Sequence, residues 1–241
     1  MEFGKKSTKV AREESIIYYH KDNSIIKESI NHLVDNILYY SIDGTHKTIQ
    51  FESSIQGESK TTTVANTAVA LGSIGKKVLV IDLDFRRARL HRAFQIENAN
   101  GLSDFMLGKI EEEKLVKSTV YKGVSIVNRG TAVENSAALL TSQKFKTLIK
   151  KFHENYDYVL LDCPPVLLIS DYIHISTLSD GILFIIAYGK TKKSQVKEAI
   201  AEIRKNDTKI IGAVFTFFDP KLANNYGDYK SYSYYNSYNY K

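Results

Sequence analysis

A turn rich in hydroxyl and backbone amide groups follows the first apolar run of the chain. It reads Ser53-Ser54-Ile55-Gln56-Gly57-Glu58-Ser59-Lys60-Thr61-Thr62 and opens a stretch with helical spacing. In a phosphate-binding loop, backbone amides point at one anionic group, a lysine neutralises phosphate charge, and the next hydroxyl binds magnesium. Lys60 and Thr61 fit these roles, although Ser54 and Ser59 stand where the G-x-x-x-x-G-K-[ST] pattern has glycine. A plain strand-turn-helix with a solvated lysine explains this turn about as well.

Carboxylates follow two further apolar runs. Asp82 and Asp84 end the run at 78–81, and Asp162 ends the run at 158–161. Two aspartates spaced by two share one side of an extended chain, and ligands of open α/β sheets bind at the carboxyl ends of the strands. One aspartate there is usually only a helix cap. Three of them beside a Lys-Thr turn and four arginines are hard to attribute to capping; the arginines are Arg86, Arg87, Arg89 and Arg92.

The elements that position these residues are visible as hydrophobic periodicity. Six short apolar runs rich in β-branched residues predict buried strands at 48–51, 78–81, 124–127, 158–161, 182–187 and 210–217. Stretches with helical spacing lie between them at 61–74, 136–156 and 192–205, and another at 24–40 precedes the first strand. The alternation predicts an α/β fold, a doubly wound, mostly parallel sheet flanked by helices.

Composition excludes several classes of protein. A chain of 241 residues that is 43% hydrophobic, with a net charge of +6, is not mainly disordered. The single cysteine, Cys163, excludes a disulfide scaffold and a zinc cage and favours a reducing cytosol. The run at 182–188 is far shorter than the ~20 residues that cross a bilayer, and the N-terminus has no apolar leader. We therefore expect a cytoplasmic protein.

The lysines at 144, 146, 150 and 151 follow a helical pattern and predict a solvated face.

The two ends differ from the body of the chain. The composition predicts a flexible arm at residues 1–20, a folded domain at residues 21–223 and a disordered tail at residues 224–241. The tail has no Leu, Ile, Val or Phe, so its tyrosines have no core to join. It is either a sticky aromatic tail or a display of phenolic hydroxyls. Its tyrosines are Tyr226, Tyr229, Tyr232, Tyr234, Tyr235, Tyr238 and Tyr240.

The order of these motifs resembles the bacterial protein-tyrosine kinases of capsule and exopolysaccharide assembly. In that family a phosphate loop, a D-x-D-x-R strand end and a D-x-P-P strand end are called Walker A, Walker A′ and Walker B, and they precede a tyrosine-rich C-terminus. Together they build a P-loop ATPase fold adapted to phosphorylate tyrosine. The resemblance covers roughly residues 24–241. Related ATPases that position septa or partition plasmids carry an additional lysine early in the loop. Ile55 stands there, which favours the kinase branch.

The resemblance also implies roles for individual residues. ATP and Mg²⁺ would be the cofactors, Lys60 and Asp82 the catalytic residues, and Asp82 the base that takes the proton of an incoming tyrosine. Thr61, Asp84 and Asp162 would hold the metal. The tail tyrosines of a neighbouring subunit would be the phosphate acceptors. Nucleotide would be bound by Gly57, Glu58, Ser59, Lys60, Thr61 and Thr62.

The same resemblance implies partners and a place in the cell. Family members form homo-oligomeric rings and act with a transmembrane polysaccharide co-polymerase adaptor, whose cytoplasmic segment activates the ATP site. A tyrosine phosphatase would reverse the modification. The protein would lie at the inner face of the plasma membrane through its adaptor, and nucleic acid would not be a partner.

Several positions depart from the family pattern. Ser59 replaces a glycine, Cys163 replaces the hydroxyl residue of D-[ST]-P-P, and Thr216 stands where the family often has an asparagine for adenine. Asn31 and Val34 replace the two arginines of the ring-forming E-x-x-R-x-x-R motif. Two alternatives therefore stay open. One is a degenerate relative with weak or no ATP turnover that serves as interaction partner or substrate. The other is a partition-type, nucleic-acid-binding ATPase, suggested by the positive charge.

Overall fold

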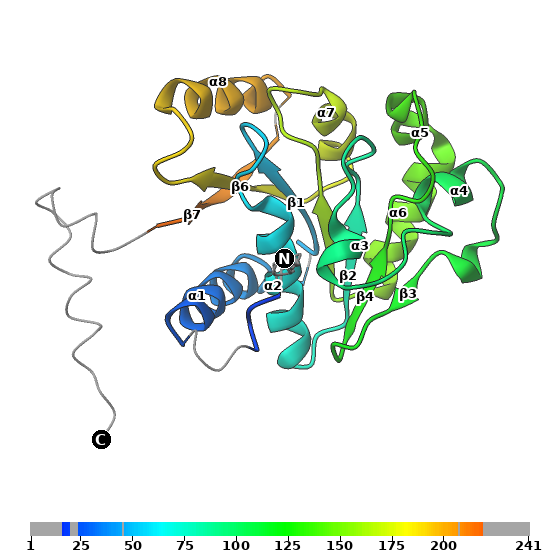
Figure 1. The fold of residues 1–241 in the computed structure, drawn as a ribbon, viewed down its shortest axis with the longest axis horizontal. Coiled ribbons are helices and arrows are strands. Elements are labelled where there is room, and N and C mark those ends of the chain that lie inside the picture. The colour runs from blue at the N-terminus through cyan, green and yellow to red at the C-terminus, as the bar shows by residue number, and fades with distance from the viewer. Residues whose placement is uncertain (1–15, 20–23, 45, 207, 219–241) are drawn as a thin grey trace, which may run out of the picture.

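The computed structural model of this chain describes residues 16–19, 24–44, 46–206 and 208–218 (Figure 1). The predicted tail with its seven tyrosines, and the predicted arm up to residue 15, lie outside the described residues.

A seven-stranded sheet forms the centre of the described part, in the order β3-β4-β2-β5-β1-β6-β7. All neighbouring strands are parallel except β3 and β4. The strands are β1 (Thr48–Ser53), β2 (Val78–Asp82), β3 (Lys117–Ser118), β4 (Val124–Val127), β5 (Tyr158–Asp162), β6 (Gly181–Ala187) and β7 (Ile210–Thr216). The six predicted strands are all present, and the mostly parallel α/β fold is confirmed. The additional strand β3 is two polar residues long and carries no hydrophobic signal.

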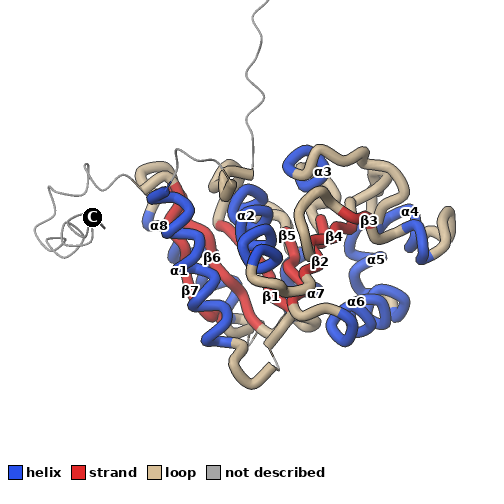
Figure 2. The backbone as a smooth tube through the Cα atoms, turned by 90° about the horizontal axis from the view of Figure 1, so that it is seen from below, coloured by secondary structure: helices blue, strands red, loops and turns tan. Residues whose placement is uncertain are grey.

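Helices cover both faces of the sheet (Figures 1 and 2). Side chains of α1 and α2 pack against one face, and side chains of α6, α7 and α8 pack against the other. The helices are α1 (Ser24–Tyr40), α2 (Lys60–Ser73), α3 (Leu90–Ala93), α4 (Leu102–Met106), the 3-10 turn η1 (Glu112–Lys114), α5 (Ser136–Thr141), α6 (Gln143–Asn155), α7 (Asp171–Ser176) and α8 (Lys193–Arg204). Because the inner strands are covered on both sides, their sequences read as continuous apolar runs.

Strand β2 shows how the two cores divide. Val80 joins the α2 side of the sheet, whereas Ile81 joins the α6 side. Both side chains are fully buried. Successive side chains of a strand point to opposite faces, so every second residue of β2 and β5 points toward α2. This alternation determines where the aspartates at the strand ends point.

The stretch 136–156 is two helices and not the single helix that its periodicity predicts. Ser142 lies between α5 and α6 with extended backbone angles, φ −66° and ψ 148°. Its hydroxyl accepts a hydrogen bond from the Phe145 N–H at 3.2 Å and so caps the start of α6. A serine that bonds its own backbone competes with helix continuation, which explains the break.

The segment 16–19 is docked on the domain, whereas the sequence predicts a loose arm up to residue 20. Ile16 and Tyr18 are each 5% exposed. The side-chain oxygen of Asn66 in α2 accepts hydrogen bonds from the backbone N–H groups of Ile17 at 2.9 Å and Tyr18 at 3.0 Å. The buried Asn66 amide thus satisfies two backbone donors of the segment 16–19. Hydrophobic periodicity does not reveal such a hydrogen-bond partner, so the sequence did not predict the docking.

Asn31 and Val34, which stand where the ring-forming motif has arginines, make contacts within their own domain. The Tyr18 hydroxyl donates a hydrogen bond to the Asn31 side chain at 2.9 Å. Val34 is 4% exposed and belongs to the core between α1 and α2. Glu28, the first residue of the motif, lies on the exposed face of α1 within 4.0 Å of His32. This part of α1 therefore packs on its own domain and presents no guanidinium group at these positions.

The surface of α6 agrees with its predicted solvated face. Lys144, Lys146, Lys150 and Lys151 are exposed, while the apolar side of the helix is buried. Within the described ranges, we find no helix whose length and apolarity would let it span a bilayer.

Candidate active site

The turn between β1 and α2 has the backbone of a phosphate-binding loop. Gly57 has a φ of +85°, and Ser59 is left-handed at φ 61° and ψ 25°. Ser54 is not among the described residues with positive φ, so it has no need of glycine. The Ser59 carbonyl accepts the Thr63 N–H at 2.9 Å, which begins α2. The loop therefore keeps its conformation without the second glycine, and Ser59 carries the cost of a left-handed backbone.

Replacing Ser59 with glycine is expected to raise the free energy of unfolding by about 0.5–1 kcal/mol, because glycine adopts this backbone without the Cβ clash. The Ser59 side chain makes no cap hydrogen bond that the substitution would remove. Urea unfolding measures the change. The matched control is Gly57→Ala, which places a Cβ at φ +85° and should lower stability. A Ser59→Gly variant less stable than the parent would contradict this account of the loop.

Lys60 and Thr61 both contact the aspartate at the end of β5. The Lys60 Nζ lies 2.6 Å from Asp162 Oδ1, and the Thr61 hydroxyl donates to Asp162 Oδ2 at 2.7 Å. Lys60 is 8% exposed and Asp162 is 1% exposed, so the pair is buried. Burial by itself would lower the pKa of Lys60, but the charge of Asp162 and the bond to it outweigh burial and raise that pKa. Lys60 is therefore a permanent cation at the base of the loop.

Asp82 reaches the same place from the neighbouring strand. It is opposite Asp162 in the parallel register of β2 and β5, and both residues point toward α2. Its carboxylate accepts the N–H groups of Asp84 at 3.2 Å and Leu90 at 3.1 Å. Burial, followed by the charge of Asp162, raises the pKa of Asp82 to about 8. In this structure Asp82 is therefore mainly protonated at neutral pH, because burial and, after it, the neighbouring Asp162 and Asp84 disfavour the charged carboxylate.

Asp84 lies at the rim, where the chain leaves β2. Its carboxylate accepts the N–H groups of Arg86 at 3.2 Å and Arg87 at 2.7 Å, which fixes the turn that carries the arginines. It is partly exposed and lines the pocket, in contrast to Asp82. Asp84 is therefore the carboxylate of the three that solvent reaches most easily.

A second buried carboxyl lies near Lys60. Glu52 in β1 is fully buried, and burial raises its pKa to about 8. The Gln50 amide donates to Glu52 Oε1 at 2.7 Å. Cys163 adjoins Glu52, and burial raises the pKa of its thiol well above the usual value. Glu52 was not among the predicted site residues, because a glutamate inside an apolar strand belongs to no recognisable motif.

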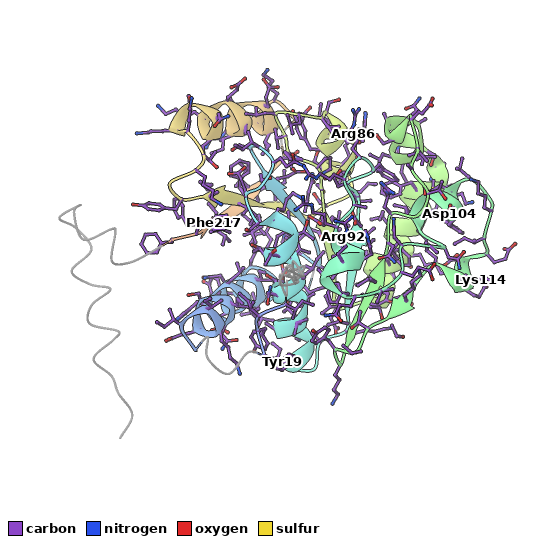
Figure 3. All side chains as sticks on the ribbon, viewed as in Figure 1. Tyr19, Arg86, Arg92, Asp104, Lys114 and Phe217 are labelled. Carbon is purple, nitrogen blue, oxygen red and sulfur yellow. The ribbon has the colours of Figure 1, made fainter. Side chains whose placement is uncertain are left out.

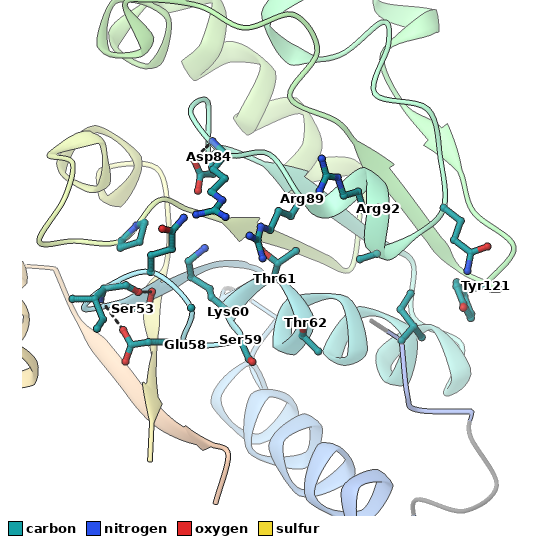
Figure 4. Close-up of a pocket in the computed structure, with 18 residues that line it drawn as sticks. Ser53, Glu58, Ser59, Lys60, Thr61, Thr62, Asp84, Arg89, Arg92 and Tyr121 are labelled. Carbon is teal, nitrogen blue, oxygen red and sulfur yellow. Dashed lines mark hydrogen bonds between the residues drawn. The ribbon is translucent and has the colours of Figure 1, made fainter. Parts of the chain in front are cut away.

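Glu58 anchors the loop to the strands beside it. Its carboxylate accepts the N–H groups of Ile55 at 2.7 Å and Ala187 at 3.1 Å, and the hydroxyl of Thr191. The Thr216 hydroxyl donates to the Glu58 backbone carbonyl at 2.9 Å. Figure 4 shows the contact between Glu58 and the loop backbone. The side chain predicted to bind nucleotide therefore shapes the loop, and Thr216 at the predicted adenine position supports it.

These residues surround a pocket of about 1100 Å³ (Figure 4). The predicted loop residues 57–62 line it together with Asp84, while Asp82 and Asp162 lie buried beneath. Other lining residues were not among the predicted site residues, and they include Ile16, Arg87, Arg89, Arg92, Gln95 and Tyr121. The arginine run offered a signal in the sequence, whereas the residues of the docked segment and of the β3–β4 turn carried none.

The oxygen ligands present suit magnesium bound together with a phosphate. Within the part of the chain that the structure describes, no group of three or more His, Cys, Asp or Glu side chains forms a metal cage. Mg²⁺ in phosphoryl-transfer sites is typically held by one or two carboxylates plus phosphate and water. The Thr61 hydroxyl lines the pocket and lies 2.7 Å from the buried Asp162 carboxylate, and both are hard oxygen atoms of the kind that Mg²⁺ prefers.

The sequence matches a known protein family and is similar to named kinases. The AAA domain family matches residues 46–213. The tyrosine-protein kinase YwqD of Bacillus subtilis is 32% identical over 217 residues, which are 90% of this chain and 92% of that protein. A putative tyrosine-protein kinase in the cps region of Klebsiella pneumoniae is 26% identical over 83% of this chain and 28% of that longer protein.

Two solved structures are similar in fold. The crystal structure of the chimerical protein CapA2B2 has a TM-score of 0.79 at 28% identity, covering 83% of this chain and 88% of that chain. The septum site-determining protein MinD of Pyrococcus horikoshii, solved with Mg-ADP, has a TM-score of 0.61 at 23% identity, covering 75% and 77%. The likeness to MinD is one of fold alone.

Proposed function

Because this chain belongs to the AAA domain family and to the bacterial tyrosine-protein kinases, we propose that it transfers the terminal phosphate of ATP to tyrosine. One observation carries the proposal. The phosphate loop, its buried Lys60 and the aspartates of β2 and β5 meet at one edge of the sheet, under a pocket large enough for a nucleotide.

The chemistry needs charge neutralisation and an aligned nucleophile. Mg-ATP supplies the phosphoryl group when bound, and the metal neutralises part of its charge. Backbone amides at the start of α2 would hold the phosphates, and Lys60 would exchange part of its contact with Asp162 for them. Thr61, Asp84 and Asp162 would hold the metal. Asp82 would accept the proton of the tyrosine hydroxyl, whose pKa near 10 makes a base useful.

The acceptors in this proposal are the seven tail tyrosines of a second copy of the chain. A sequence with many hydroxyls close together raises the local concentration of acceptor at the neighbouring site. Names of relatives such as the Klebsiella kinase in a cps region support a role in capsule or exopolysaccharide production. We further propose a transmembrane adaptor at the inner face of the membrane, and a phosphatase that removes the phosphates.

Two full-length variants test the proposal. The first carries Tyr→Phe at all seven tail positions and serves as donor; the second carries Asp82→Asn and serves as acceptor. Incubated together with ATP and magnesium, they should give phosphotyrosine on the Asp82→Asn chain, detected by immunoblot and mapped by mass spectrometry. The Asp82→Asn chain alone is the control and should stay unmodified.

The outcome separates the open alternatives. Phosphotyrosine in the mixture supports a kinase that acts between chains. A mixture without phosphotyrosine, together with no Mg-ADP binding in calorimetry, would favour a degenerate relative that is itself a substrate or partner. A shift of duplex DNA by the wild-type chain would favour the partition-type ATPase.

A further inference from the structure

Three arginines on one side of the pocket have no partner for their charge. Arg87, Arg89 and Arg92 line the pocket and are exposed. Within the described ranges, none of their side chains forms an ion pair or a hydrogen bond. Figure 4 shows Arg89 and Arg92 on the side of the pocket toward Tyr121. We call these three residues the arginine limb.

The arginine limb has the charge and the hydrogen-bond donors to bind an anion. Three like charges in one pocket repel one another, and a bound anion relieves that repulsion. The planar guanidinium group donates two parallel hydrogen bonds to a phosphate, which makes such contacts strong and geometrically selective. The phosphate loop with Lys60 lines the same pocket and offers a second set of anion-binding groups.

The pocket has room for more than one phosphate-bearing group. Its volume of about 1100 Å³ exceeds the usual range of about 300–1,000 Å³ for small-ligand sites. Tyr121 also lines the pocket, where its ring stacks on Tyr19 and packs edge-on with Phe94, so a ring that enters beside the arginines meets an aromatic cluster. A ligand that combines a phosphate with an aromatic ring matches both features.

We propose that the arginine limb binds phosphotyrosine in the tail of a second copy of this chain. The inference rests on the proposed kinase function and gives the same site a second role, the recognition of its product. Residues 224–241 contain two lysines and one aspartate, so an unmodified tail offers the arginines no net negative charge. Each phosphate adds about −1.5 to −2 charge, which reverses the sign.

Retention of the product would make later transfers easier. A tail held through its first phosphotyrosine keeps its remaining hydroxyls near Asp82 and Lys60, which raises their effective concentration. Tyr232 and Tyr234 are two residues apart, or about 7 Å in an extended chain. The proposal therefore predicts that one phosphorylation favours the next on the same tail.

Peptide binding tests the proposal without catalysis. The probe is a labelled synthetic peptide of residues 224–241 phosphorylated at Tyr234, compared with the unphosphorylated peptide. Fluorescence anisotropy measures the affinity of each peptide for the full-length chain. The chain is dephosphorylated beforehand and kept free of ATP, so that its own tail carries no phosphate. We expect the phosphopeptide to bind at least tenfold more tightly. Arg89→Gln with Arg92→Gln should remove that preference, since each charged hydrogen bond contributes about tenfold in affinity.

The matched control lies in the same segment. Arg86 is exposed but does not line the pocket, so Arg86→Gln removes the same charge and should leave phosphopeptide affinity unchanged (Figure 3). A second double variant, Arg89→Lys with Arg92→Lys, keeps the charge without the planar fork and should bind with intermediate affinity. Thermal unfolding verifies that every variant is folded.

Three results would overturn the proposal. They are equal affinity for the two peptides, an equal loss in Arg86→Gln, and complete displacement of the phosphopeptide by saturating Mg-ADP, which would assign the arginines to the nucleotide. Binding that persists with Mg-ADP supports it. Because no phosphate is transferred in this assay, a chain without kinase activity can still bind phosphotyrosine, and an active kinase can still fail to do so.

Discussion

Lys60→Met is expected to abolish phosphotyrosine formation and also to destabilise the protein. In the proposed reaction Lys60 neutralises charge on the transferred phosphate, so its loss should lower the rate by about 10²- to 10³-fold or more. Lys60 also neutralises Asp162 in a buried pair with an N–O distance of 2.6 Å. Removing one partner of such a pair leaves an uncompensated charge and costs about 3–5 kcal/mol. Immunoblotting and urea unfolding measure the two effects.

A second substitution separates catalysis from stability. In the double variant Lys60→Met with Asp162→Asn, no buried carboxylate is left without its cation, so stability should largely recover while phosphotyrosine formation stays absent. A double variant as unstable as Lys60→Met would show that the ion pair is not the cause of the loss. Unaltered phosphotyrosine formation in Lys60→Met would remove Lys60 from the reaction.

Asp82→Asn is expected to lower phosphotyrosine formation by about 10²- to 10⁴-fold, the usual contribution of a general base. The pKa of Asp82 is about 8, raised by burial and by the charge of Asp162. The wild-type rate should therefore rise with pH as the carboxylate forms, at a pH below about 8, because Mg²⁺ held by the neighbouring aspartates would favour the charged carboxylate. Initial rates between pH 6 and pH 9.5 measure the profile, and a flat profile would argue against Asp82 as the base.

The same group makes stability depend on pH in a definite direction. Its folded pKa of about 8 lies above the model value of 3.8, so the folded state holds the proton more tightly than the unfolded state. The stability gained from that proton is complete below pH ~4 and is lost as pH rises through about 8. Asp82→Asn should therefore be close to wild type in stability near pH 4 and increasingly more stable than wild type as the pH rises from there to 9.

Glu52→Gln is the matched control for this experiment. Glu52 also has a pKa of about 8, because of burial, but it does not line the pocket. Its substitution should reduce the loss of stability at high pH in the same way, while the rate still rises with pH as in the wild type. If Glu52→Gln instead removed the rise, Glu52 and not Asp82 would be the group that controls the rate.

Most of the fold could be predicted because parallel strands buried on both faces read as continuous apolar runs in the sequence. The six apolar runs correspond to β1, β2 and β4–β7, and three of the four predicted helices match α1, α2 and α8 within a residue. The short elements α3, α4, α7, η1 and β3 were not predicted. Each spans six residues or fewer, which is too short for a periodic signal.

The site was partly predictable for a similar reason. Residues at the carboxyl ends of parallel strands must meet at one edge, so the approach of Lys60, Asp82 and Asp162 follows from the order of the motifs. The roles of Glu58 and Asn66 could not be foreseen, because each depends on backbone N–H groups supplied by other parts of the fold. The same holds for Ser59, whose left-handed backbone depends on the surrounding loop.

The register of β2 and β5 has a consequence for how this protein can vary. Asp82 and Asp162 stand opposite each other in the ladder, so both carboxylates depend on strand alignment. Inserting or deleting one residue within either strand would turn its aspartate to the far side of the sheet. The loop, in contrast, holds its shape with serine in place of glycine. Substitutions in the loop can therefore leave the site intact. A one-residue insertion or deletion within β2 or β5, in contrast, would remove a carboxylate from the site and abolish the reaction.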